Sequence, residues 1–371
     1  MKILFLDQFN EMGGAQQCLL DLVDSLPRGG LVAALPGSGR LSEELLKRDV
    51  AVHELPAMNY GNGRKTISDA VRFALATPRM ASAVEDIASA HDVDLLYVNG
   101  PRLLPAASRV RREMVFHAHS YLNRRYSASL ARRCLRRSGT RSIACCDFVA
   151  SALRPHAAHV IYNGVREIPF RFPGVDSTPR IGIVGRIAPE KGQIDFVRAA
   201  RMLTARGISA QYFVHGAPLF SGSRYLRLVH SEAGQLPIEF AGWSDAVANV
   251  FAGLDILVVP SSRIEATSRV ILEAFSAGVV VVAYPSGGIP EVVENGVTGV
   301  LTASSTPQAI AVAVEELLAD PRRMISMALA ARRAWEQRFT LQRYVREVQE
   351  FLGVAPRETR VPQQRPAALQ S

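Results

Sequence analysis

The stretch from residue 258 to residue 299 constrains the fold more than any other part of this 371-residue chain. One apolar run, residues 255–259, ends at Pro260, and a second follows at residues 279–283. Continuous apolar runs of this length are typical of strands buried in a parallel sheet. Parallel neighbours need a crossover connection, and the segment between the two runs has helical spacing. The stretch therefore predicts a strand, a helix and a second parallel strand.

The predicted helix carries its own start and stop signals. Thr267 or Ser268 can cap its amino end, and Gly278 can supply the left-handed residue that ends it. Its apolar stripe consists of Val270, Ile271, Ala274 and Phe275. A glycine turn at residues 286–288 follows the second strand. We therefore expect the amino end of the helix to open beside the carboxyl end of the first strand.

Two carboxylates accompany this helix. Glu265 and Glu273 are separated by seven residues, and Glu265 is expected in the loop before the helix. Both can then line one crevice at the carboxyl end of a strand, where open α/β sheets bind ligands. Carboxylates suit vicinal hydroxyls, and free amides at the start of a helix suit phosphate. The combination indicates a nucleotide sugar as the ligand.

The stretch resembles the large retaining glycosyltransferase family of GT-B architecture, whose signature of two glutamates seven residues apart is matched by Glu265 and Glu273. The match continues through Ala274, Gly278, Gly287, Gly288, Pro290, Glu291, Gly296 and Gly299. The resemblance implies that Glu265 contacts the transferred sugar and Glu273 the ribose. It places four further residues at the donor: Thr267, Ser268, Arg269 and Val270. Thr267 and Ser268 stand where many members have Phe and Gly, so the backbone path over the donor phosphates can differ.

Length and composition favour two α/β domains. A chain of 371 residues is long for one core, and 48% hydrophobic with 21% charged residues is ample for a globular protein. No apolar run approaches the roughly 18 residues of a membrane span. Asp7 follows the first apolar residues too soon for a signal peptide. We therefore expect a cytoplasmic protein.

The cysteines and the acidic pairs give no sign of a metal site. The four cysteines, Cys18, Cys134, Cys145 and Cys146, include no CxxC pair and no spacing typical of zinc ligands, which favours a reducing compartment. Asp92 and Asp94 form the Asp-x-Asp pattern of metal-dependent glycosyltransferases, but they lead directly into an apolar run and are interpreted as a turn. We expect no metal and no cofactor beyond the donor substrate.

The chain begins with a strand at residues 2–7 and a helix at residues 15–26. Gly13 and Gly14 lie between them, where backbone can approach a phosphate without a side chain intervening. By resemblance to the family, this loop faces the donor diphosphate. The glycines at residues 37–39 lack the third glycine and the later acid of a dinucleotide-binding fingerprint, so we interpret them as an ordinary turn.

Two histidines end the strand predicted at residues 114–119. His117 and His119 alternate by two and so share one face of that strand. In the family this strand ends in an active-site histidine that contacts the donor sugar. His119 fits that position better because it directly precedes Ser120, and His117 remains the alternative.

Five other residues are candidates from loops and strand ends. The resemblance implies that Arg186 and Lys191 hold the diphosphate in the loop after the strand at residues 180–185, where two cations can neutralise the leaving group without a metal. Residues 239–243 are predicted as a loop where, by resemblance to the family, the nucleotide base sits, and Trp243 either stacks on that base or packs as a structural indole. His215, near the end of a strand at residues 211–216, and Asn163, in the last strand of the first domain, are further candidates.

The predicted domain boundaries follow from these motifs. We expect a first, acceptor-side Rossmann-like domain at residues 1–166, a linker at 167–179 and a nucleotide-sugar domain at 180–339. By resemblance, a final helix at about 340–353 packs back on the first domain. Residues 354–371 are polar and contain proline, which predicts a disordered tail.

Positive charge is concentrated in the first half of the chain. Residues 1–166 hold 22 Lys and Arg against 15 Asp and Glu, and residues 123–141 alone carry seven arginines and no acid. This run is predicted to be helical. Either it forms a solvated basic face, or it attracts anionic lipid headgroups at the inner face of a membrane.

These observations predict a metal-independent retaining hexosyltransferase that uses a nucleoside diphosphate sugar. Its acceptor would be a glycan or a lipid-linked hydroxyl, in cell-surface polysaccharide or glycolipid assembly. One alternative is a sugar-nucleotide 2-epimerase of the same architecture. The pI of about 9.7 also suits a nucleic-acid-binding protein. The arginines lack interleaved aromatic residues, however, so we expect no nucleic acid among the partners.

Overall fold

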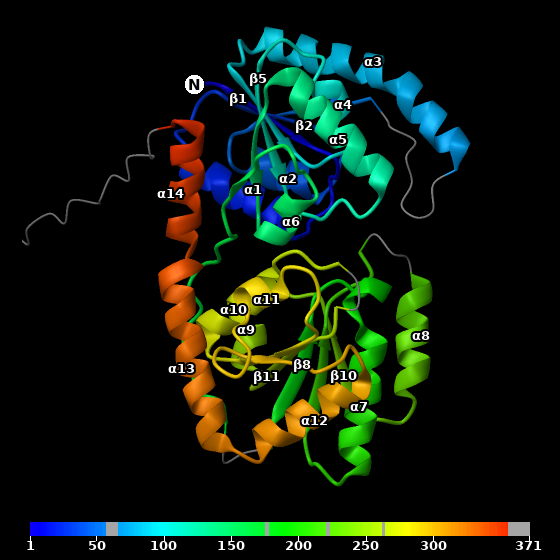
Figure 1. The fold of residues 1–371 in the computed structure, drawn as a ribbon, viewed down its shortest axis with the longest axis vertical. Helices are drawn as coiled ribbons and strands as arrows, with labels where there is room; N and C mark the ends of the chain where they lie inside the picture. The colour runs from blue at the N-terminus through cyan, green and yellow to red at the C-terminus, as the bar shows by residue number, and fades with distance from the viewer. Residues whose placement is uncertain (57–65, 175–177, 220–222, 262–263, 355–371) are drawn as a thin grey trace, which may run out of the picture.

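A computed structural model describes residues 1–56, 66–174, 178–219, 223–261 and 264–354. Two α/β domains lie one above the other (Figure 1), each built on one parallel sheet flanked by helices. This architecture confirms the predicted fold class. Of the sequence-based expectations, the tail lies outside the described residues from residue 355 onward.

The first domain contains a seven-stranded sheet in the order β3-β2-β1-β4-β5-β6-β7. Its strands are β1 Ile3–Asp7, β2 Leu31–Pro36, β3 Ala51–Leu55, β4 Leu95–Asn99, β5 Glu113–Ala118, β6 Arg141–Ala144 and β7 His159–Val160. Its helices are α1 Gly14–Ser25, α2 Arg40–Leu46, α3 Ile67–Ala90, α4 Leu104–Ala107, α5 Arg125–Ser138 and α6 Asp147–Ser151. The strand order reverses between β1 and β4, the kind of point where such sheets bind ligands.

The second domain contains a six-stranded sheet in the order β10-β9-β8-β11-β12-β13. Its strands are β8 Arg180–Val184, β9 Gln211–His215, β10 Ile238–Gly242, β11 Ile256–Val259, β12 Val280–Ala283 and β13 Val300–Leu301. Its helices are α7 Gln193–Ala205, α8 Ser223–Ala233, α9 Val247–Ala252, α10 Arg269–Ala277, α11 Ile289–Val292, α12 Pro307–Leu318 and α13 Pro321–Arg338, with a 3-10 turn at Pro189–Lys191. β11, α10 and β12 form the strand-helix-strand unit predicted from the sequence.

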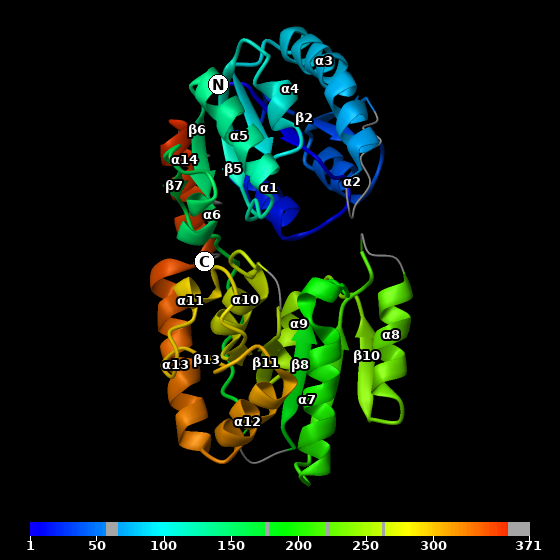
Figure 2. The ribbon, with the colours of Figure 1, turned by 45° about the vertical axis from the view of Figure 1, so that its right-hand side comes forward.

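The last two helices of the chain lie along one side of the molecule (Figure 2). α13 packs against α10 in the second domain. The final helix, α14 (Leu341–Leu352), packs against α1 instead, and its Tyr344, Val348 and Leu352 join Phe5 and Tyr97 in the core of the first domain. The chain therefore passes between the domains twice.

Two elements differ from expectation. The 24-residue helix α3 was not predicted, and no residue of its first ten is buried. Residues 239–243 were predicted as a loop, which is wrong: Ile238–Gly242 pairs in parallel with β9 as strand β10. Only Trp243 of that segment follows the strand. No helix among the described residues is long and apolar enough to span a membrane.

Candidate functional site

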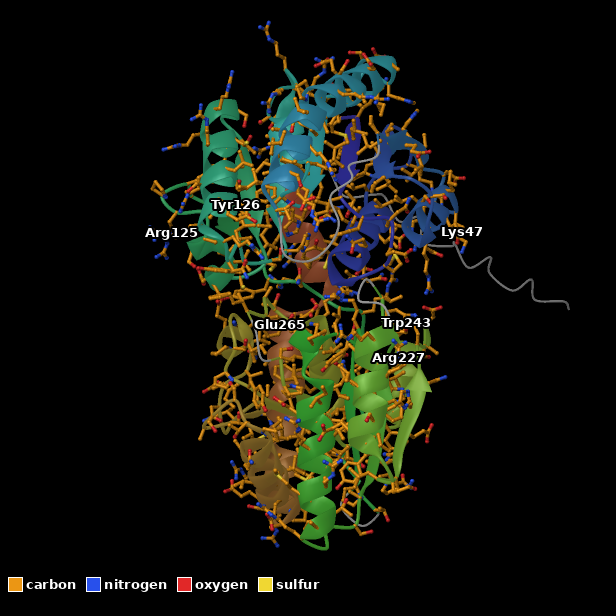
Figure 3. The ribbon with its side chains drawn as sticks, turned by 90° about the vertical axis from the view of Figure 1, so that its right-hand side faces the viewer. Lys47, Arg125, Tyr126, Arg227, Trp243 and Glu265 are labelled. Carbon is orange, nitrogen blue, oxygen red and sulfur yellow. The ribbon has the colours of Figure 1, made fainter. Side chains whose placement is uncertain are left out.

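A cavity of about 460 Å³ opens between the two domains. Every candidate residue named above except His117 lines it: Gly13, Gly14, His119, Asn163, Arg186, Lys191, His215, Trp243, Glu265, Thr267, Ser268, Arg269, Val270 and Glu273. Figure 3 shows Glu265 and Trp243 at the end of the second domain that faces the first. Residues from both halves of the chain therefore meet at one cavity.

Glu265 is fixed in the loop before α10 by the glycine turn that follows β12. The N–H of Gly288 donates to the carbonyl oxygen of Glu265 at 3.0 Å. Gly287 has φ +59°, and a Cβ there would lie 1.9 Å from the same oxygen, so the close approach requires glycine. The turn between two segments distant in sequence therefore sets the position of the Glu265 backbone.

The side chain of Glu265 is paired with a cation. Lys191 Nζ donates to Glu265 Oε2 at 2.7 Å. Burial alone would raise the pKa of Glu265, but the charge and hydrogen bond of Lys191, together with the charge of Arg186, hold it below the usual value. Glu265 is thus ionised at neutral pH, with a cation beside it at the cavity wall.

The second predicted cation also has an acidic neighbour. Arg186 Nη2 lies 3.2 Å from Glu190 Oε1, four residues later in the same loop. Gly192, which follows this loop, has φ +76°, and a Cβ there would lie 2.1 Å from the carbonyl oxygen of Pro260. The loop that carries Arg186 and Lys191 is therefore pressed against the end of β11, next to Glu265.

The amino end of α10 opens onto the cavity. The helix begins after Ser268, as predicted, but the Ser268 side chain makes no capping hydrogen bond. Thr267 Oγ1 does not cap the helix either, because it accepts from Asn163 Nδ2 at 3.1 Å. The expected side-chain cap is therefore wrong, and the first turn of α10 keeps its amide donors without a side-chain partner from either residue.

Glu273 lies one turn into α10 with Arg269 as its neighbour. Burial raises the pKa of Glu273, partly countered by Arg269, whose Nε lies 4.0 Å from Glu273 Oε1. Arg269 also reaches the first domain, where its Nη2 donates to Asp21 Oδ2 at 3.1 Å and its Nη1 donates to the carbonyl oxygen of Gly164. Asp21 is 2% exposed. A buried ion pair therefore joins α10 to α1 across the domain boundary.

The glycine loop of the first domain faces this helix. Gly13 precedes α1 in an extended conformation, and Gly14 is the first residue of α1. A Cβ on Gly14 would lie 3.6 Å from Arg269 Cδ. The two helix amino ends, one from each domain, thus lie on the same cavity.

The two histidines have different surroundings. His119 lines the cavity, and its Nε2 lies 2.8 Å from Asn99 Oδ1. His117 is fully buried behind it, with ring centroids 3.8 Å apart and its Nδ1 2.5 Å from the hydroxyl of Tyr97. Burial lowers the pKa of both rings, that of His119 to about 3. The structure places His119 on the cavity wall and His117 in the core.

The opposite end of the cavity carries the aromatic candidates. Trp243 is 42% exposed, and its Nε1 donates to Asp245 Oδ1 at 3.0 Å. Asp245 also accepts from Arg40 of the first domain at 2.6 Å. His215 stacks on Phe213, with burial lowering the pKa of its ring. Trp243 is therefore held beside a second contact between the domains.

No cluster of metal ligands exists among the described residues. Asp92 and Asp94 both contact Lys2. The Nζ of Lys2 lies 3.3 Å from Asp92 Oδ2, and its backbone N–H donates to Asp94.

Sequence reasoning missed the partners that support the site. Asn99 contacts His119 and is held by Asp7, and Asp21 accepts from Arg269. None of the three was a candidate from the sequence. A signal existed for two of them, because Asp7 and Asn99 are the last residues of β1 and β4. The rule that singled out His119, a polar residue at the carboxyl end of a buried strand, applies to both.

Comparisons with known proteins agree with this geometry. Residues 178–320 match the family described as glycosyl transferases group 1. A GDP-mannose-dependent alpha-(1-6)-phosphatidylinositol monomannoside mannosyltransferase of Mycolicibacterium smegmatis is 28% identical over 325 residues, which cover 73% of this chain and 79% of that protein.

Solved structures show the same two-domain arrangement. HepE of Anabaena, in complex with UDP-glucose, superposes with a TM-score of 0.81 and 25% identity, covering 95% of this chain and 99% of that one. Sucrose-phosphate synthase of Thermosynechococcus elongatus, at 17% identity and a TM-score of 0.75, shows the fold alone and covers 95% of this chain and 98% of that one. The fold of the chain is therefore that of the GT-B enzymes.

Proposed function

Because this chain is a hexosyltransferase whose residues 178–320 match the glycosyl transferases group 1 family, we propose that it transfers a hexose from a nucleoside diphosphate donor to an acceptor hydroxyl with retention of configuration. The observation that carries the proposal is the convergence of Glu265, Glu273, Lys191 and the start of α10 on one cavity. These groups supply acceptors for hydroxyls next to donors and positive charge for phosphate.

The donor occupies the cavity with its diphosphate at the amino end of α10. The free amides there and the cations Arg186 and Lys191 neutralise charge that develops on the leaving nucleotide. Glu273 accepts from the ribose hydroxyls, and the base extends toward Trp243. Support comes from the Anabaena relative, whose structure contains UDP-glucose.

Glu265 accepts hydroxyl hydrogen bonds from the transferred sugar. Lys191 is already 2.7 Å from Glu265, so the same cation can bridge the Glu265 carboxylate and the donor phosphate once the donor is bound. His119 contacts the sugar from the first domain. The acceptor enters from that domain and attacks on the face that the diphosphate leaves.

The reaction proceeds without a metal ion. The two cations of the Arg186 loop replace the divalent ion that otherwise neutralises a departing diphosphate. Transfer must then survive a chelator. Strict dependence on manganese or magnesium contradicts this part of the proposal.

A panel of UDP-, GDP- and ADP-hexoses identifies the donor. Thermal shifts of the full chain rank the nucleotides, and release of nucleoside diphosphate in the presence of an acceptor then measures transfer. The function is wrong if no member of the panel both raises the unfolding temperature and is consumed. Release of free nucleotide without any acceptor, together with inversion at the sugar 2-position, would indicate the epimerase alternative.

The acceptor is carried by a lipid at an anionic membrane surface. Five arginines of α5 and its start are exposed and have no acidic partner in the part of the chain that the structure describes: Arg124, Arg125, Arg133, Arg136 and Arg137. Arg141, the last of the basic run, is different because it pairs with Glu113 at 2.7 Å. In Figure 3, Arg125 and Tyr126 lie on the flank of the first domain opposite Lys47.

An apolar stripe accompanies these arginines. Ile67, Val71 and Leu75 recur at one-turn intervals on α3 and are 86%, 51% and 75% exposed. A groove of about 190 Å³ lies between α3, α4 and α5, lined by side chains such as Phe73 and Leu130, with Arg133 and Arg137 among them. Apolar side chains beside unpaired cations suit insertion at an anionic bilayer surface. The mannosyltransferase relative acts, by its name, on a phosphatidylinositol monomannoside.

A further inference from the structure

Two buried polar side chains support the ring of His119 from behind. Asp7 and Asn99 end the neighbouring parallel strands β1 and β4 and stand opposite each other in the register. Asn99 Nδ2 donates to Asp7 Oδ2 at 2.6 Å, and Asn99 Oδ1 lies 2.8 Å from His119 Nε2. Asp7 and Asn99 are 0% and 2% exposed. A continuous chain of hydrogen bonds therefore leads from the sheet to the cavity wall.

The Asp7 end of this series of hydrogen bonds determines which group donates and which accepts in each of them. The Asp7 carboxylate accepts from Gln16 Nε2 and from the N–H of Phe9 in addition to Asn99. Asn99 Nδ2 also lies 3.4 Å from the carbonyl oxygen of Ala15. Every group on that side of Asn99 is an acceptor, so its amide must turn NH₂ toward Asp7 and its oxygen toward His119.

An amide oxygen only accepts, so His119 Nε2 must carry the ring proton. The other ring nitrogen, Nδ1, then has a lone pair, and it is buried without a hydrogen-bond partner among the described residues. The ring of His117 stacks against His119 and is itself held at its Nδ1 by Tyr97. Burial keeps the pKa of His119 near 3, so the ring stays neutral at working pH.

We propose that Asn99 and Asp7 are positioning residues that fix His119 in the Nε2–H tautomer and thereby set the direction of its ring dipole at the cavity wall, where the transferred sugar lies. The inference rests on the proposed function, because the tautomer matters to transfer only if a sugar lies against His119. As the glycosidic bond breaks, the sugar gains positive charge. A neutral ring with its proton held at Nε2 places a fixed dipole beside that charge, and moving the proton to Nδ1 roughly reverses the dipole.

The near-isosteric change Asp7→Asn inverts the chain of hydrogen bonds. The oxygen of the new amide remains where it accepts from the N–H of Phe9, so its NH₂ faces Asn99. Asn99 then turns its oxygen toward position 7 and its NH₂ toward His119, and it loses the 3.4 Å contact of its Nδ2 with the carbonyl oxygen of Ala15. His119 Nε2 becomes the acceptor, and the proton moves to Nδ1.

The tautomer is measured by ¹H–¹⁵N correlation spectra of the full chain labelled at histidine nitrogens, with the His119 signals assigned by their loss in His119→Gln. The spectra are recorded at about pH 8, because burial raises the pKa of Asp7 to about 7 and the test requires its carboxylate form. We expect Nε2–H in the wild type and Nδ1–H in Asp7→Asn. We expect kcat to fall about tenfold, with the KM for the donor within about twofold, because the reversed dipole acts on charge that develops only in the transition state. Gln16→Leu removes a bond to Asp7 without reversing the chain, so the tautomer should stay Nε2–H.

If Asp7→Asn does not fold, Asn99→Ala provides a second test, because His119 Nε2 then has no partner and both tautomers should be populated. A wild-type ring in the Nδ1–H form overturns the inference, as does an unchanged tautomer in the folded variants. Inversion of the tautomer with unchanged kcat overturns its link to transfer. The spectra need no substrate, so they test the tautomer even if no donor is turned over, a result that would refute the proposed function alone.

Discussion

The cavity wall of the second domain and helix α5 of the first domain carry their positive charge in opposite ways. In the second domain the cations at the cavity are paired with acids: Lys191 with Glu265 at 2.7 Å and Arg186 with Glu190 at 3.2 Å. In the first domain the exposed arginines of α5 face outward, without acidic partners among the described residues. Paired charges in a cavity suit a small ionic ligand with both phosphates and hydroxyls, whereas unpaired charges on a flank suit an extended anionic surface. The family match, residues 178–320, covers the domain with the paired charges.

The largest expected effect is on the free energy of unfolding and comes from replacing Asp21. Asp21 does not fit the contrast, because it is an acid of the first domain that pairs with a cation of the second. Arg269 belongs to the second domain but pairs with this buried carboxylate of the first at 3.1 Å. Asp21→Ala should lower the free energy of unfolding by about 3–5 kcal/mol, because it leaves a buried guanidinium without its acid. Urea titration followed by circular dichroism measures the change.

The matched control for Asp21 is Asp24→Ala on the same helix. Asp24 is 35% exposed where it pairs with Arg48, so its loss should cost no more than about 1 kcal/mol. Equal losses for the two variants would show that the pair across the domain boundary contributes no more than a surface contact.

Lys191→Ala tests whether the paired cation of the second domain acts on the leaving group. We expect kcat to fall by roughly a hundredfold to a thousandfold, because one preorganised charge is removed where negative charge develops. Steady-state transfer assays measure it. Arg227→Ala on the exposed face of α8 is the control in the same domain and should keep wild-type kcat. A Lys191 variant with unchanged kcat would leave the pair with Glu265 as a purely structural contact.

Glu273→Gln tests the ribose assignment. Loss of a charged acceptor should weaken nucleoside diphosphate binding by about 1.5–3 kcal/mol. Isothermal titration calorimetry gives the affinity, and Glu316→Gln, on the exposed face of α12, should leave it unchanged. Affinity within error of the wild type would remove Glu273 from the donor site and weaken the contrast between the domains.

The smallest effect per residue is expected on the outer flank of the first domain. Arg133→Gln with Arg137→Gln should weaken binding to vesicles containing phosphatidylglycerol by about 1 kcal/mol for each charge. Co-sedimentation measures it, and a few hundred millimolar salt should abolish binding in the wild type. Arg198→Gln with Arg201→Gln changes the net charge equally on the second domain, where both arginines pair with Glu232, and should have no effect. Equal binding of the wild type to neutral vesicles would favour the other interpretation, in which the arginines of α5 form a solvated surface.

The sequence predicted the unit of β11, α10 and β12 well because both of its strands are buried on both faces. Residues 256–259 and 280–283 are fully buried, so their apolar runs are unbroken and mark where the cavity-facing loops begin. The half-exposed strand β10 has no such run, since its residues are intermediate or exposed, and it was interpreted as a loop. Helix α3 was missed because its first ten residues bury nothing and Pro78 interrupts its pattern.

Within the site, sequence reasoning found which residues line the cavity but not how they pair. Lys191 and Glu265 lie 74 residues apart, and each was assigned to a different part of the donor before the structure brought them together. Asn99 and Arg269 likewise gain their roles from contacts between strands and between domains. Local spacing predicts helices and strand ends, but it does not carry information about such long-range pairs.

The position of α14 reverses the order in which the two domains can be completed during synthesis. All seven strands of the first domain's sheet have been synthesised once residue 160 is made, yet Tyr344, Val348 and Leu352 still belong to its core. The second domain contributes every strand and helix of its own by residue 338, before α14 exists. The apolar face of α1 that α14 later covers therefore stays exposed while the second domain is translated. The domain that is begun first is the one that is finished last.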